Sequence, residues 1–141
     1  MRLINGPVTP SAISDIIAKA GENKEYGAHS LFLEQVRSDS SDGRFIMAIE
    51  YSAFEEMVTM EADKINKTIV SEFEDVKAIE IIHSKGLVNT GEISLLVMVS
   101  AGHRDHATKA CAKAVEMIKG KLPILKKEKF EDKSSQKKQN E

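Results

Sequence analysis

The sequence predicts a single α+β domain in which helices pack on a mostly antiparallel sheet. The hydrophobic period switches between two and about 3.6 residues along the chain, in the order helix, strand, strand, helix, strand, strand, helix. The chain has 141 residues, of which 41% are hydrophobic and 30% charged, the size and balance of one globular domain. We expect this domain to cover residues 1–130.

The first elements are defined by caps and by changes of period. A helix is predicted to begin at Thr9-Pro10, with Thr9 as its cap and Pro10 at its first position, and to end near Gly21. Residues 27–36 have the mixed alternation of a strand. A loop rich in Ser and Asp separates them from a second predicted strand, residues 44–51.

A long helix and two further strands follow. Apolar residues that step by three or four predict a helix of about five turns from Ala53. Its apolar face consists of Phe54, Val58, Ala62, Ile65, Ile69 and Phe73. Residues 76–83 and 92–101 are predicted strands, joined by a turn that contains Gly86 and residues 89–91. The second strand is almost entirely apolar, which predicts a central position buried on both faces.

The last predicted helix covers residues 103–121 and carries Cys111 on its apolar face, where the thiol is expected to be a small buried side chain. Pro123 ends this helix, and residues 124–125 begin a short extended piece before a run of lysines. Residues 131–141 are polar and of low complexity, so we expect a disordered tail.

The charge is unevenly distributed. Residues 119–129 contain five lysines and one glutamate, a local charge of +4 in a chain whose net charge is −2. One cationic patch on an acidic body favours a local anionic ligand over a long nucleic-acid groove. The seven aromatic residues are too few for an obvious base-stacking surface. Nucleic-acid binding is therefore not expected.

Common signatures of cofactor chemistry are missing from the sequence. It contains no G-x-G-x-x-G, P-loop, H-E-x-x-H or G-x-S-x-G motif, so we expect no bound cofactor. The four histidines do not show convincing ligand spacing, and a single cysteine excludes both an intrachain disulfide and a cysteine-rich zinc site, so no metal is expected. With no membrane-length apolar run and no signal peptide at the start, we expect a cytoplasmic protein.

Two pairs of basic residues are candidates for chemistry. His103-Arg104 follows a buried strand at the start of a helix, where free N–H groups favour an anion; the alternative is a helix cap beside a solvated arginine. Lys119 and Lys126 flank the Pro123 break, where the chain turns, so both amines could enter one pocket. The alternative is a solvated cationic helix end.

Six segments, in order and with consistent gaps, carry a family resemblance. They are Val36-Arg37, Ile49–Phe54, Ile82–Leu87, Gly91-Glu92, Ser100–Arg104 and Ile118–Glu128. Together they resemble the large, catalytic subunit of molybdopterin synthase, over roughly residues 3–130. The chain departs from the family pattern at Glu34, Ser84, Gly102 and Leu125.

The resemblance implies an enzyme, a sulfurtransferase that converts cyclic pyranopterin monophosphate to molybdopterin. The sulfur comes from a thiocarboxylate on the C-terminal Gly-Gly of a small ubiquitin-like subunit, which joins a homodimeric core of the large subunit to make a heterotetramer. Lys119 and Lys126 are implied to be catalytic. The implied substrate-binding residues are Gln35, Val36, Arg37, His103, Arg104, Lys119, Lys126, Lys127 and Glu128. The alternative function is a dimeric module, without catalysis, that binds a ubiquitin-like protein or a phosphorylated metabolite.

Overall fold

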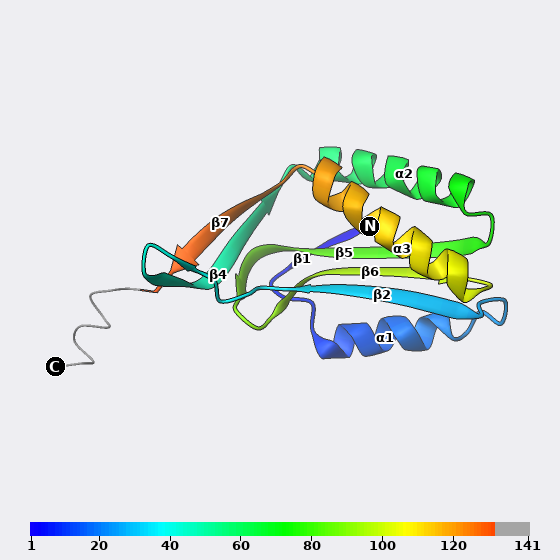
Figure 1. Ribbon diagram of the computed structural model, residues 1–141, viewed down its shortest axis with the longest axis horizontal. Helices are drawn as coiled ribbons and strands as arrows, with labels where there is room; N and C mark the ends of the chain where they lie inside the picture. Colours follow the sequence, from blue (N-terminus) through cyan, green and yellow to red (C-terminus); the bar gives the residue numbers. More distant parts are fainter. Residues whose placement is uncertain (132–141) are drawn as a thin grey trace.

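The computed structural model describes residues 1–131, which form one α+β domain (Figure 1). The helices are α1 (Pro10–Ala20), α2 (Glu55–Glu72) and α3 (Arg104–Lys121). The strands are β1 (Arg2–Asn5), β2 (Ala28–Gln35), β3 (Ser40–Ser41), β4 (Arg44–Ala53), β5 (Val76–Asn89), β6 (Ile93–Ala101) and β7 (Ile124–Phe130). The predicted fold class and order of the larger elements are confirmed.

The sheet is mostly antiparallel, in the order β2-β6-β5-β4-β3, with β1 paired to β5 and β7 paired to β4. Strand β6 lies between β2 and β5 and is buried along nearly its whole length, as its continuous apolar run predicts. Strand β1 is the parallel exception, with Leu3 opposite His83. It was not predicted, because four residues next to a turn carry no readable period.

Helices cover both faces of the sheet (Figure 1): α2 and α3 lie on one face and α1 on the other. The side chains of alternate residues in β6 point to opposite faces of the sheet. Leu95, Val97 and Val99 pack with α2 and α3 in the larger core cluster. Leu96 and Met98 pack with side chains of α1 in a second cluster. This division explains why β6 has no polar face.

Strand β5 is longer than predicted and takes part in two sections of the sheet. Its first part pairs with β6 and β1, and residues 86–89 pair with β4. Gly86, with φ +81°, lies at the change of partner, directly opposite Tyr51. The turn predicted to include Gly86 is therefore confined to the residues that follow Asn89, and the left-handed glycine sits inside the strand instead.

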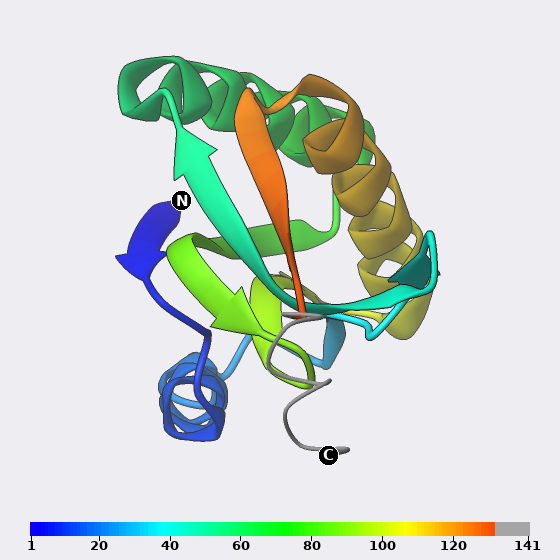
Figure 2. The same ribbon diagram turned by 90° about the vertical axis from the view of Figure 1, so that its left-hand side faces the viewer.

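Strands β4 and β7 form an arm that extends beyond the helices (Figure 1), and Figure 2 shows the two paired strands from the end of this arm. The sequence predicted only a short extended piece at residues 124–125, and this expectation was wrong in length. Strand β7 runs to Phe130 and pairs with β4 along its whole length, with one irregularity in the register. The guanidinium of Arg44 lies 4.7 Å from the centre of the Phe130 ring, which holds the far end of the arm.

Local chemistry sets the helix starts. The Thr9 hydroxyl accepts a hydrogen bond from the N–H of Ala12 at 3.1 Å, as the predicted cap requires. At α3, the His103 N–H donates to the Asp75 carboxylate at 2.7 Å. A Cβ on Gly102 would lie 2.5 Å from that carboxylate, so a larger residue there would push the Asp75 side chain away from this cap.

Strand β7 ends at Phe130. The predicted tail, residues 131–141, lies outside the described residues except for Glu131. None of the helices found in the described part of the chain has the length and apolar content that a membrane crossing needs.

Candidate active site

A pocket of about 180 Å³ lies where the end of α3, the start of β7, β4 and β5 meet. Lys119 enters it from the last turn of α3 and Lys126 from β7. His83 of β5 and Tyr51 of β4 form part of its wall. The structure therefore brings the two predicted catalytic lysines together, although one is on a helix and the other on a strand.

The turn between Lys119 and Lys126 is set by Leu122 and Pro123. Leu122 caps α3 in an extended conformation, and Pro123 cannot continue the helix because it lacks an N–H and fixes φ. The chain then enters β7, where Lys126 lies opposite Tyr51 in the antiparallel ladder. Directly opposite residues share a face of the sheet, so the ladder aims Lys126 at the pocket side.

The same ladder separates the neighbouring residues of the lysine run. Lys127 pairs with Glu50 on the opposite face of the arm, away from the face that carries Lys126. Glu128 pairs with Ile49 on the pocket side. Neither residue lines the pocket.

His83 is a feature of the site that the sequence did not single out. It is 5% exposed, and its ring packs edge-on against Tyr51 with 5.1 Å between ring centres. Its Nδ1 lies 2.7 Å from the Ser84 carbonyl oxygen, which can only accept, so Nδ1 carries the proton. A buried histidine between two strand residues has no distinctive spacing, and only its place beside the lysines identifies it.

Burial controls the protonation of both wall residues. It lowers the pKa of His83, and Lys119 and Lys126 lower it further against the opposing effects of the Ser84 carbonyl and Glu34. His83 is therefore neutral at pH 7. Burial also raises the pKa of Tyr51, and the charge of Glu34 acts in the same direction against a hydrogen bond with Ser94. The wall thus supplies a neutral imidazole and a neutral phenol beside two amines.

Glu34 binds Lys119 directly. Both oxygens of its carboxylate lie 2.7 Å from Lys119 Nζ. The sequence marked Glu34 only as a departure from the family pattern, since residues 85 positions apart give no local sign of pairing. The contact places one carboxylate at the edge of the lysine pocket.

The predicted substrate residues after β2 are spread over different environments. Val36 is 2% exposed and packs with Tyr51 and Val88 behind the pocket, so it supports the wall. Gln35 is exposed at the end of β2. The Arg37 side chain is 83% exposed and pairs with Asp39 at 2.7 Å. Arg37 thus lies at the surface and does not line the pocket.

His103 and Arg104 lie at the other end of α3. Fifteen positions of helix separate Arg104 from Lys119, about 22 Å along the axis. The His103 side chain is 88% exposed, with Nδ1 3.2 Å from Asp75. The pKa of Asp75 is lowered, because two hydrogen bonds and the charge of His103 outweigh its partial desolvation. Within one copy of the chain, this pair does not reach the lysine pocket.

Cys111 is buried on α3, as predicted, and burial raises the pKa of its thiol against a hydrogen bond with Ser30. It is therefore a packing residue and not an activated nucleophile. Across residues 1–131, the His, Cys, Asp and Glu side chains form no group of three placed to hold a metal ion.

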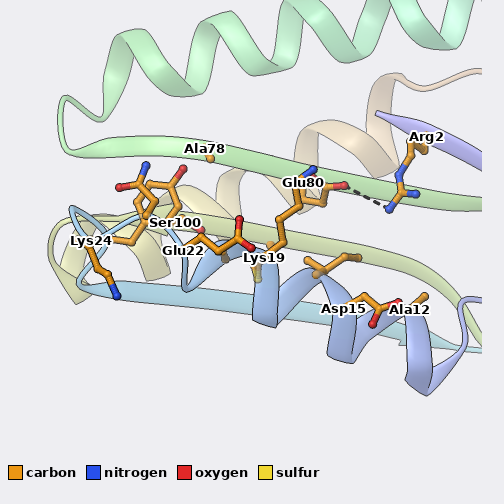
Figure 3. Close-up of a pocket in the computed structure, with 14 residues that line it drawn as sticks. Arg2, Ala12, Asp15, Lys19, Glu22, Lys24, Ala78, Glu80 and Ser100 are labelled. Carbon is orange, nitrogen blue, oxygen red and sulfur yellow. Dashed lines mark hydrogen bonds and ion pairs between the residues drawn. The ribbon is translucent and has the colours of Figure 1, made fainter.

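A larger cavity, of about 1000 Å³, lies between α1 and the sheet (Figure 3). Its polar lining carries both signs of charge, and Arg2 pairs there with Glu80 at 3.5 Å. None of the predicted site residues lines it. The cationic pocket, with its convergent lysines, is therefore the better candidate for chemistry on an anion.

Comparison with known proteins connects this geometry to a family. The family model described as MoaE protein matches residues 5–121. The molybdopterin synthase catalytic subunit of Dictyostelium discoideum is 41% identical over 107 residues, covering 75% of this chain and 67% of that protein. The subunit of the same name from Drosophila persimilis is 34% identical over 131 residues, 93% of this chain and 35% of that protein. The chain thus spans about a third of the length of that relative.

Solved structures share the fold. The crystal structure of molybdopterin synthase from Staphylococcus aureus superposes with a TM-score of 0.79 at 28% identity, covering 92% of this chain and 90% of that one. A complex of subunits 1 and 2 of molybdopterin-converting factor from Helicobacter pylori gives a TM-score of 0.78 at 21% identity, covering 94% and 86%. At that identity the second likeness concerns the fold alone.

Proposed function

The chain belongs to the MoaE protein family, and on that premise we propose that it is the catalytic subunit of a molybdopterin synthase. It would be a sulfurtransferase that converts cyclic pyranopterin monophosphate to molybdopterin. The sulfur donor would be a small ubiquitin-like subunit with a C-terminal Gly-Gly thiocarboxylate. The observation that carries this proposal is the convergence of Lys119 and Lys126 on one pocket.

The size of the pocket favours the end of a carrier tail. About 180 Å³ is smaller than the roughly 300–1,000 Å³ of pockets that enclose a whole small molecule. Two glycines have no side chains, so a Gly-Gly end can enter a narrow opening. Its terminal thiocarboxylate is an anion, which the ammonium groups of Lys119 and Lys126 would bind.

The wall supports proton transfer. Neutral His83 and neutral Tyr51 lie beside the lysines, so a proton can be taken up or given off close to the reacting carbonyl. In this proposal, Lys119 and Lys126 are the catalytic residues. Once the sulfur of the tail is bonded to the substrate, an amine in its neutral form can attack the tail carbonyl, so that a C–N bond forms, the C–S bond breaks and the substrate leaves as a thiolate.

The phosphate and pterin would be bound by the other predicted residues. Arg104 and the free N–H groups at the start of α3 suit a phosphate, with His103 beside them. About 22 Å of helix separates this group from Lys119, so a single small substrate cannot touch both in one copy. We therefore propose a homodimer in which His103 and Arg104 of a second copy complete the pocket, as the core of a heterotetramer with two carriers.

The remaining assignments are also part of the proposal. Gln35, Arg37, Lys127 and Glu128 would contact substrate or carrier from the surface around the pocket, and Val36 would act by packing beneath it. The proposed location is the cytoplasm, where a single cysteine that forms no intrachain disulfide fits a reducing compartment.

The direct test is a single-turnover assay with purified carrier thiocarboxylate and cyclic pyranopterin monophosphate, measuring dithiolene formed per enzyme. We expect product that depends on the thiocarboxylate and is not formed with the carboxylate carrier. Tight carrier binding with no product would instead support the non-catalytic module.

A further inference from the structure

The Lys119 ammonium is engaged by Glu34 before any ligand is present. Both carboxylate oxygens lie 2.7 Å from Nζ, and the two side chains are 26% and 41% exposed for Glu34 and Lys119. An ammonium group has three N–H bonds, and this contact uses two of them. One N–H of Lys119 therefore remains for a ligand in the pocket.

Strand geometry aims Glu34 at the helix. Ala28 and Phe32, earlier on β2, pack against the core cluster that contains α3, and alternation places Glu34 on the same face. The β2–β6 register then shifts between Glu34 and Gln35, a bulge of the kind that redirects a side chain at the end of a ladder. The contact is thus specified by the sheet and is not a chance meeting of surface side chains.

Glu34 changes the charge that a ligand meets. The titratable groups around Lys119 are Glu34 on β2, Tyr51 on β4, His83 on β5 and Lys126 on β7. Among residues 1–131, no carboxylate lies within ion-pair distance of Lys126, whereas Glu34 neutralises Lys119. An entering anion therefore meets an available ammonium at Lys126 and an occupied one at Lys119.

We propose that Glu34 is a positioning residue that occupies Lys119 through their ion pair and yields it to the anionic end of the carrier. The identity of that anion rests on the proposed function. Binding is then an exchange of ion pairs: the carrier terminus contacts Lys126 and replaces Glu34 on Lys119. In the resting protein, Glu34 keeps the Lys119 amine from reacting with other electrophiles.

The reactivity of the amine tests this without carrier or pterin. The full chain is labelled with a trace of a neutral N-hydroxysuccinimide ester at about pH 8, and the rate at each lysine is read by peptide mass spectrometry. The ester must reach the Lys119 nitrogen, which both Glu34 oxygens contact at 2.7 Å, so Glu34→Gln, which removes the ion pair, should raise the Lys119 rate several-fold. Lys121, on the same helix, is the internal reference and should not change.

Two further variants make the result specific. Glu50→Gln removes an exposed carboxylate 3.7 Å from Lys129 and should leave the Lys119 rate as in the wild type. Glu34→Asp keeps the charge on a shorter side chain and should give an intermediate rate; it also carries the test if Glu34→Gln does not fold. A Lys119 rate within about twofold of wild type in the folded Glu34 variants would overturn the proposal.

Carrier binding separates this inference from the proposed function. Glu34→Gln should bind the carrier carboxylate several-fold more tightly, with no gain for a carrier whose terminus is an amide. In a Lys119→Gln background, Glu34→Gln should have no such effect, because its partner is gone. If wild type and variants all fail to bind the carrier, the proposed function fails, and the labelling rates still decide the role of Glu34.

Discussion

Lys126 lies directly opposite Tyr51 in the β4–β7 ladder, and this pairing gives the lysine pocket its second amine. Tyr51 is 5% exposed and packs against His83, so its position is fixed by the core. Lys126 takes its direction from that fixed partner. Lys119, by contrast, is placed by the last turn of α3 and by Glu34. The two amines are thus positioned by independent elements.

Lys119→Ala should lower kcat by about two orders of magnitude or more, because a catalytic amine contributes in the transition state and not only in binding. Lys126→Ala should both lower kcat and raise KM, since the proposed function also has Lys126 bind the carrier end. The measurement is dithiolene formed in single turnover with preloaded carrier.

Lys121→Ala and Lys129→Ala are the matched controls, with the same loss of charge outside the pocket. They should retain nearly full activity. Equal, small losses of activity in all four variants would mean that the lysines act only through their combined positive charge and not as individual catalytic groups.

Extra residues after the Gly-Gly end of the carrier should abolish turnover. The pocket is narrow and the terminal group must reach the lysines, so an extended chain cannot place its reacting carbonyl there. Turnover is compared for carriers with and without a short extension, with folding of both checked by circular dichroism. Unchanged turnover with the extended carrier would contradict the inserted-tail mechanism.

Mixing Lys119→Ala with Arg104→Ala protein should restore activity that neither has alone. If the two groups meet across a dimer, each mixed dimer contains one intact site, and a statistical mixture recovers about a quarter of wild-type turnover. A mixture of Lys119→Ala with Lys126→Ala should recover nothing, because both lysines belong to one pocket. No recovery in the first mixture would show that the second copy does not supply Arg104.

His83→Gln should remove the part of the pH dependence of the unfolding free energy that comes from His83. The pKa of His83 is lowered from 6.5 in the folded state by burial, so the unfolded chain takes up a proton at higher pH. Its contribution to stability is full above about pH 6.5 and is lost as pH falls through the lowered folded value. Urea unfolding at about pH 8, 7, 6 and 5 should show the wild type losing stability relative to the variant below about pH 6.5. If the unfolding free energies of the wild type and the variant changed with pH in parallel, His83 would titrate alike in the folded and unfolded chains.

Gly102→Ala should lower the Tm by about 3 °C or more, because the added Cβ displaces the Asp75 carboxylate from its bond to the His103 N–H. The pKa of Asp75 is lowered in the folded state, so its contribution is present above about pH 4 and is lost as pH falls through the folded value. The Tm difference should therefore shrink below about pH 4. Gly120→Ala, where a Cβ meets nothing within 4 Å, is the control and should not lower the Tm.

Much of the secondary structure could be predicted because its signals are local. Thr9 and Pro10 mark the start of α1, and the apolar period of residues 104–121 marks α3, since caps and helix faces depend on neighbours within a few positions. The order of short motifs identified the family for the same reason. The lysine pair on either side of Pro123 was also visible, because seven residues with a proline break imply a turn.

The site itself depends on pairings that no local period contains. Strand β7 was predicted too short because its lysine-rich segment has no alternation of apolar and polar residues. Residues 124–130 form a strand because they pair with β4. The same pairing directs Lys126 to the pocket face and Lys127 away from it. His83 and Glu34 join Lys119 across 36 and 85 positions, through sheet register and a bulge. The sequence by itself determined the elements and the family, whereas the tertiary structure decided which side chains share the pocket, because strand partners and register are set by long-range packing.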